Sequence, residues 1–388
     1  MSIGRAGTVA ALGTAQTLAW ASTYYLPAIL AAPMARDLGV STPTVFAAFS
    51  AALIVSALLG PRAGAAIDRL GGRPVLIGTS LVFAAGLTAL GLAQGPVSLI
   101  AAWVVLGIGM GSGLYEAAFA ALVRLLGSQS RASITGITLI AGFASTVGWP
   151  LSAFLESQVG WRGACFAWAA LHLVVGLPLN ALLPRASAVV TEKALDPLPA
   201  APDEKTASMR ATLALSFVFA ATWFTSTAMA AHLPRLLQAS GVSMAGAVLV
   251  GALIGPSQVG ARLLEFGLLR KLHPLLSARL AAAMHPLGAA LMALAGAPAA
   301  AAFGVLHGAG NGILTIAKGT LPLVIFGPRG YGRRQGLLMM PARIAQALAP
   351  WLFGIALDRW GSGALVISAT LGVLALLALF TIPKNLGS

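Results

Sequence analysis

The sequence predicts an all-α, polytopic membrane protein with twelve transmembrane helices in two pseudo-symmetric six-helix bundles. Composition is the first observation, because 58% of the 388 residues are hydrophobic and 9% are charged. Soluble domains carry about 25% charged residues. A helix needs about 20 apolar residues to cross a bilayer, so the chain can supply about twelve crossings. The composition excludes a soluble enzyme and a single-anchor receptor. The other two observations are the positions of the basic residues and an internal repeat.

Apolar runs between glycine, proline and charged breaks define the spans. They cover residues 6–33, 43–67, 74–93, 97–123, 132–156, 162–183, 209–233, 243–266, 275–295, 297–325, 336–357 and 362–383. The apolar run after the basic N-terminus continues to about Ala32, so we expect a retained helix and not a cleaved signal. The polar stretch in the middle is too poor in apolar residues to pack. We predict an N-terminal bundle over 1–183, a cytoplasmic linker over 184–208 and a C-terminal bundle over 209–388.

The basic residues set the orientation, because Lys and Arg stay on the cytoplasmic side during insertion. If the N-terminus is cytoplasmic, four of the 24 Lys and Arg residues fall on the outer side: Arg36, Arg162, Arg235 and Arg359. We therefore expect a multi-pass protein of the cell membrane, the inner membrane if the source is bacterial, with both termini cytoplasmic. The net charge of +14 then faces anionic lipid. No nucleic-acid partner is needed, and we expect a monomer.

Matching residues recur in the two halves at a constant offset. Asp68 and Arg73 correspond to Glu265 and Arg270, and Gly111 and Gly113 correspond to Gly308 and Gly310, each pair 197 residues apart. Six helices therefore occur twice in the same orientation. Parallel repeats of this kind imply two bundles with a pathway between them.

Residues 64–73 read GAAIDRLGGR. With Gly64, Asp68, Arg69, Gly71 and Arg73 in register, they resemble the signature loop between helices two and three of the major facilitator superfamily. The twelve-span pattern extends this resemblance over nearly the whole chain. The resemblance implies a secondary active transporter that works by alternating access.

Asp68 ends a helix, where the partial negative charge of the helix would repel it. It therefore needs a cation or the N-terminus of another helix; Arg69 and Arg73 are candidates, and the resemblance implies the start of helix eleven. We predict a cytoplasmic gate formed by Gly64, Asp68, Arg69, Arg73, Glu265 and Arg270. The alternative is that these residues only anchor the loop and set topology.

Charged and polar side chains inside the spans predict a water-filled cavity, because an ionisable group at mid-bilayer costs about 2.5–3.5 kcal/mol. Glu116, Lys318 and Arg343 all lie about 10–12 Å from a cytoplasmic span end. Polar residues share helix faces in spans one, seven, ten and eleven. The predicted substrate-binding cavity contains Gln16, Trp20, Tyr24, Thr225, Ser226, His307, Asn311, Lys318, Arg343 and Gln346. For any single member, hydrogen bonding between helices is the alternative.

The charges in this cavity favour an anionic or carboxylate-bearing solute, since Lys318 and Arg343 outnumber Glu116. A salt bridge from Glu116 to one of these cations is the alternative. Glu116 is also the acid deep enough to take up and release a proton, so we assign proton coupling to it. Arg262, with Gln258 four residues before it, resembles the monocarboxylate transporter branch, although the Asp and the helix-one Lys of that branch are missing.

Other functions receive less support from the sequence. No metalloprotease motif, phosphate-binding loop or paired carboxylates occur, so we expect no enzyme, no cofactor and no metal site. The glycines of residues 107–113 lie inside an apolar span and predict close helix packing. A drug antiporter would carry an Arg where Trp103 stands, but proton-driven efflux of drugs or other toxic compounds remains the alternative. From a different class, a membrane sensor could use the same fold without transport.

Overall fold

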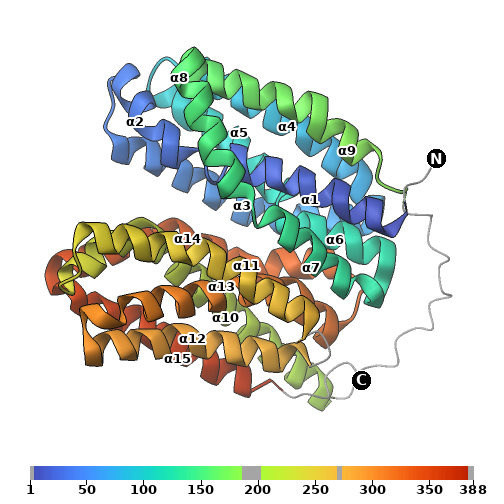
Figure 1. Ribbon diagram of the computed structural model, residues 1–388. Coiled ribbons are helices and arrows are strands. Elements are labelled where there is room, and N and C mark those ends of the chain that lie inside the picture. Colours follow the sequence, from blue (N-terminus) through green and yellow to red (C-terminus); the bar gives the residue numbers. More distant parts are fainter. Residues whose placement is uncertain (1–3, 186–201, 269–272, 383–388) are drawn as a thin grey trace. The chain divides into compact units, whose positions relative to one another are not determined.

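The computed structural model describes residues 4–185, 202–268 and 273–382, which are helical with no strand in these ranges (Figure 1). Helices cover all of the predicted spans. Within the described ranges, eight stretches are long and apolar enough to cross a membrane. Two of them, Pro96–Ala181 and Tyr331–Phe380, each cover more than one predicted span. The all-α membrane fold is confirmed, while the count of twelve crossings stays a prediction.

The chain divides into two compact units. The first comprises Met1–Lys193 together with Pro328–Leu337, and the second comprises Ala194–Gly327 and Leu338–Ser388. The short segment Pro328–Leu337 therefore groups with the N-terminal helices, although the predicted division assigns it to the C-terminal bundle. Most of the predicted linker lies outside the described residues, and its predicted last residues belong to a helix that begins at Pro202.

The α-helices of the first unit that precede the linker are coloured from blue to green in Figure 1. They are α1 (Arg5–Ser22), α2 (Pro27–Asp37), α3 (Thr42–Leu70), α4 (Gly72–Gly91), α5 (Pro96–Gly113), α6 (Tyr115–Leu126), α7 (Arg131–Ala141), α8 (Ala144–Leu171) and α9 (Leu177–Ala181). The first predicted span is broken into α1 and α2, because Pro27 has no backbone N–H and starts a new helix. The fourth is broken at Leu114, whose backbone is extended. Gly160, with φ of 69°, separates the fifth and sixth predicted spans within α8.

The second unit is built from α10 (Pro202–Ala239), α11 (Met244–Gly267), α12 (Pro274–Ala295), α13 (Ala300–Phe326), the remainder of α14 (Tyr331–Trp360) and α15 (Leu365–Phe380). One hydrophobic cluster contains Phe219, Leu321 and Leu379. Another contains Met229, Phe303 and Phe353. The apolar stretch that contains α13, Ala297–Phe326, is 72% buried, the largest share among the candidate spans of the described residues, so α13 is the most enclosed helix of this unit.

Glycines let α5 and α13 approach their neighbours closely. A Cβ atom on Gly107 would lie 2.6 Å from the carbonyl oxygen of Ala52 on α3, and one on Gly109 would lie 2.6 Å from the ring of Phe83 on α4. In the second unit, a Cβ on Gly308 would lie 2.7 Å from the carbonyl oxygen of Ile254 on α11. Both units thus use glycines of the fourth repeated helix for close packing, as the apolar glycine pattern predicts.

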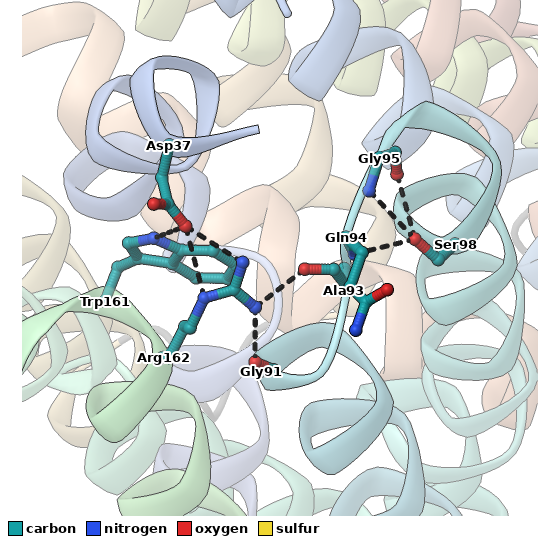
Figure 2. Close-up of polar contacts among 8 residues, drawn as sticks. All are labelled: Asp37, Gly91, Ala93, Gln94, Gly95, Ser98, Trp161 and Arg162. Atoms are coloured by element: carbon teal, nitrogen blue, oxygen red, sulfur yellow. Dashed lines mark hydrogen bonds and ion pairs between the residues drawn. The ribbon is translucent and has the colours of Figure 1, made fainter. Parts of the chain in front are cut away.

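Arg162 of α8 contacts the end of α2 and the residues at the end of α4 (Figure 2). Its Nη2 donates to Asp37 Oδ2 at 2.9 Å. Its Nη1 donates to the carbonyl oxygens of Gly91 at 2.8 Å and Ala93 at 2.6 Å. The indole Nε1 of Trp161 donates to the same Asp37 oxygen at 3.2 Å. These contacts join the ends of α2 and α4 to α8, directly after its break at Gly160.

Replacing Arg162 with Ala should lower the free energy of unfolding by about 1–2 kcal/mol, because a partly exposed ion pair and two charge-assisted bonds to carbonyls are lost. Thermal unfolding of the purified protein in detergent measures the change. Arg235→Ala is the matched control, since the more exposed Arg235–Asp358 ion pair of the second unit should contribute less than about 1 kcal/mol. Equal shifts in the two variants would contradict this account of Arg162.

Candidate functional site: two charged clusters and a polar cavity

Asp68 lies in the last turn of α3 and binds the first turn of α14. Its Oδ1 accepts the backbone N–H of Gly332 at 2.9 Å, and its Oδ2 accepts that of Arg333 at 2.9 Å. The partial positive charge of a helix N-terminus stabilises a carboxylate in this position. The start of α14 is therefore a partner of Asp68, as the family resemblance implies.

Helices α3 and α14 meet here through glycines. A Cβ atom on Gly64 would overlap the carbonyl group of Gly332, and one on Gly336 would lie 2.5 Å from the backbone of Gly60. Any side chain at Gly64 would therefore push the two helices apart. Arg124 of α6 adds a further contact, because its Nε donates to the carbonyl oxygen of Asp68 at 3.0 Å. Arg124 was not among the predicted gate residues.

The other predicted gate residues are more dispersed. Arg69 is exposed and Arg73 is half-buried, while both carboxylate oxygens of Asp68 accept bonds from α14. Glu265 is buried on α11 of the second unit, with 4% of its surface exposed. Arg270 lies outside the described residues. The structure therefore brings Gly64 and Asp68 together at α14, and the gate role of the set stays a proposal.

Two buried cations of the second unit share one indole ring. Lys318 Nζ lies 4.0 Å from the centroid of the Trp223 ring, and Arg343 Cζ lies 5.2 Å from the same centroid. Arg343 Nη1 also donates to Gln346 Oε1 at 3.0 Å. The predicted residues Lys318, Arg343 and Gln346 thus belong to one cluster around Trp223 of α10. We call these four residues the cationic cluster.

Trp223 was not a predicted site residue, because an indole inside an apolar span is indistinguishable from a packing residue until its neighbours are known. Arg262, the residue that resembles the monocarboxylate transporter branch, is 5% exposed, and its Nε donates to the carbonyl oxygen of Gly312 at 3.4 Å. Its interior position shows that it is part of the packing between α11 and α13.

A small cavity of about 40 Å³ lies inside the second unit. Its polar lining comes from α10, α12 and α13: Thr222, Thr225, Ser226, His285, His307 and Asn311. Four predicted residues, Thr225, Ser226, His307 and Asn311, are therefore brought together. His285 is an addition, although the rule that an ionisable residue within a span marks a functional site could have identified it.

The predicted residues of the first unit fall into separate contacts. Gln16 is buried, and its Nε2 donates to the carbonyl oxygen of Gly113 at 2.6 Å, so it bonds α1 to the end of α5. The Trp20 ring lies 5.2 Å from that of Tyr24 and 4.9 Å from that of Tyr115, centroid to centroid. For Gln16 the structure favours the alternative of hydrogen bonding between helices, while Trp20 and Tyr24 belong to an aromatic cluster.

Glu116 lies in the first turn of α6, directly after the break at Leu114. It is half-buried, and α6 packs against α3 within the first unit. Glu116 therefore belongs to the first unit, whereas Lys318 and Arg343 belong to the second.

Asp68→Ala should increase hydrogen exchange at the amides of Gly332 and Arg333 by about tenfold, because both lose a charge-assisted acceptor. Asp68→Asn keeps one acceptor oxygen and should give an intermediate increase. Hydrogen-exchange mass spectrometry on the peptide that begins α14 measures the effect. Arg69→Ala in the same loop is the control. Unchanged exchange in Asp68→Ala would show that the carboxylate does not hold this end of α14.

The chain is similar to known proteins in sequence and in fold. The Major Facilitator Superfamily profile matches residues 12–303. An uncharacterized 38 kDa protein in a 23S RNA operon of Thermoproteus tenax is 29% identical over 364 residues, covering 92% of this chain and 90% of that protein.

Solved structures share the fold. The human organic anion transporter TETRAN is 18% identical with a TM-score of 0.68, covering 98% of this chain and 99% of the other. The proton:xylose symporter XylE is 14% identical with a TM-score of 0.75, covering 99% and 98%. The E. coli fucose:proton symporter FucP is 15% identical with a TM-score of 0.70, covering 97% and 98%. Because the family profile matches residues 12–303, three quarters of the sequence, the chain belongs to the Major Facilitator Superfamily and is a multi-pass membrane transporter of a small solute, not an enzyme.

Proposed function

We propose that the protein carries a small organic anion across the cell membrane by alternating access, and that proton movement drives the transport. The observation that carries this proposal is the cationic cluster, in which Lys318 and Arg343 are buried on one indole ring. A carboxylate is the group that best balances two neighbouring positive charges in a medium of low polarity.

The geometry around Arg343 supports recognition of a carboxylate. A guanidinium presents several N–H donors in a rigid plane and can bind a carboxylate through two parallel hydrogen bonds. Gln346 Oε1 fixes one of these donors. Gln346 Nε2 is buried and has no hydrogen-bond partner within the described structure, so it can donate to an oxygen of the solute. Lys318 then supplies a second charge from α13.

We further propose that the contact of Asp68 with α14 acts as the cytoplasmic gate. Two hydrogen bonds to Asp68 and the glycines at Gly64 and Gly332 give α3 and α14 a close, specific contact. Such a contact can open as a unit, because bulky side chains do not interlock there. The predicted orientation puts this end of the helices in the cytoplasm.

The main alternative is proton-driven efflux of drugs or other toxic compounds. A drug antiporter of this superfamily would carry an Arg where Trp103 stands, and Trp103 is fully buried with its ring 5.3 Å from that of Phe49, centroid to centroid. This position is thus filled by apolar packing. The two cations also disfavour a positively charged drug. These observations support an anion in preference to a cationic compound.

Transport by purified protein in liposomes tests the substrate class. Labelled organic acids should accumulate under an imposed pH gradient, while cationic drugs should not. Arg343→Gln and Lys318→Gln should each lower the rate of anion uptake by about tenfold or more, because each removes a buried charge that contacts the anion. Arg62→Gln, which changes an exposed residue, is the matched control. Accumulation of cationic drugs with no uptake of organic acids would favour the efflux alternative.

Glu116→Gln tests the assigned proton carrier in the same liposomes. A glutamine cannot take up and release the proton, so gradient-driven accumulation should be abolished while exchange of solute for solute continues. If accumulation persists unchanged, Glu116 is not the proton carrier.

A further inference from the structure

We propose that His285 and His307 form a site that binds one proton in the second unit. The proposal deepens the proposed function, because it rests on transport being coupled to protons and names a binding site for them besides Glu116. It arises from three observations: a hydrogen bond between the two rings, a ring nitrogen with no partner, and a cavity of water-sized dimensions next to them.

The two histidines come from neighbouring helices and contact each other directly. His285 Nδ1 of α12 and His307 Nδ1 of α13 are 2.9 Å apart, and the ring centroids are 4.9 Å apart at an interplanar angle of 68°. Both side chains are buried, with 8% and 5% exposed. Phe303 stacks against the His307 ring at 6.0 Å between centroids. The pair is therefore fixed by packing and by its own hydrogen bond.

A bond between two Nδ1 atoms limits how many protons the pair can hold. One ring must donate its Nδ1–H and the other must accept with its Nδ1 lone pair, so a neutral pair contains two ring protons in total. A third proton can form an N–H bond with the Nε2 lone pair of the donating ring. That step gives one imidazolium hydrogen-bonded to one neutral imidazole. A fourth proton would place hydrogens on both Nδ1 atoms and break the bond between the rings.

When His285 is the ring that donates its Nδ1–H, its Nε2 carries the lone pair that takes the additional proton. It is a buried ring nitrogen with no hydrogen-bond partner in the described structure. Leaving such an atom unsatisfied is unfavourable, and an unsatisfied buried polar atom in a native protein calls for a functional or solvent explanation. A proton arriving from water would use the lone pair of the donating ring and leave hydroxide or conjugate base in the solvent.

The cavity beside the two histidines is large enough for water molecules but too small for an organic solute. Binding sites for organic molecules enclose about 300–1,000 Å³, whereas a water molecule needs about 10–15 Å³ of such space. The cavity encloses about 40 Å³ and therefore fits a few waters. Thr225, Ser226 and Asn311 in its lining can hydrogen-bond to these waters. The pair thus borders a polar space that water molecules can occupy.

The histidine pair is a separate ionisable site, because the charged side chains of the surrounding helices do not line the cavity beside it. On α10 the described ionisable residues are Arg210, His232 and Arg235, and on α11 they are Arg262 and Glu265. Arg279 of α12 binds the carbonyl oxygen of Leu379, and α13 carries Lys318. The part of α14 within this unit carries Arg343, Asp358 and Arg359, and Asp358 pairs with Arg235. The sequence of α15 contains no ionisable residue. Described residues facing the pair across the cavity from α10 and α15 are Thr222, Thr225, Ser226, Gly372 and Ala375, none of which titrates.

A shared helix connects the proton site to the cationic cluster. His307 and Lys318 are eleven residues apart on α13, about 16 Å along the helix. A proton on the pair adds a positive charge to the same helix that carries Lys318. It would therefore favour a bound anion, which is the relation that proton-coupled uptake of an organic acid requires.

Nitrogen-15 NMR of ring-labelled histidine tests this site without any solute. The full-length protein in lipid nanodiscs is titrated between about pH 8 and pH 4, the range in which histidines titrate in proteins. Two of the five histidines should shift together and take up one proton between them. His285→Gln should abolish the joint shift and change the tautomer of His307, and His307→Gln should act likewise on His285. Either variant suffices for assignment if the other does not fold.

His232→Gln is the matched control, because His232 is a half-buried histidine of the same unit that contacts the carbonyl oxygen of Pro350 at 2.7 Å. It should leave the joint titration unchanged. The inference is overturned if both rings stay neutral throughout the pH range in which the protein remains helical, or if each ring takes up a proton of its own.

Liposome transport separates this inference from the proposed function. If the pair takes up one proton but no organic acid is carried, the proposed function fails and the proton site stands. If organic acids accumulate under a pH gradient while the pair does not titrate, the proton site is wrong and the proposed function stands.

Discussion

A hydrocarbon medium cannot solvate a charge or a polar group, and this constraint explains most of the specific contacts in the protein. Within a predicted span, Gln16 donates to a backbone carbonyl. Asp68, just beyond its predicted span, is held by the backbone of α14. Arg343 is held by Gln346 and lies over an indole shared with Lys318. The contacts with α14 are those proposed for gating, and the contacts around Trp223 are those proposed for solute binding.

The duplicated architecture repeats the packing more faithfully than the polar chemistry. Glycines at matching positions of α5 and α13 allow close helix contact in both units. Ion pairs also join helix ends in each unit, but with the charges exchanged: Asp37 of α2 binds Arg162 of α8, whereas Arg235 of α10 binds Asp358 of α14. The cationic cluster and the histidine pair are described in the second unit, while the first carries an aromatic cluster around Trp20. The halves have thus kept a fold and diverged in chemistry.

Several site residues could be predicted because their position within an apolar span is itself improbable. Lys318, Arg343 and Gln346 were identified in this way, and they lie in one cluster. Trp223 could not be found by the same rule, since an indole is compatible with a lipid-facing or packed position. Arg124 lies near a span end, where a basic residue is expected for topology alone, so its bond to the carbonyl of Asp68 had no sequence signal.

The sequence by itself determined the all-helical membrane fold, the positions of the apolar segments and the internal repeat, because hydrophobic length and periodicity are local properties of the chain. Only the tertiary structure decided that α1 and α2 are separate helices, that Gln16 bonds a neighbouring helix, and that His285 meets His307. These features depend on which helix faces meet. That choice follows from packing between segments far apart in the sequence, which no local pattern specifies.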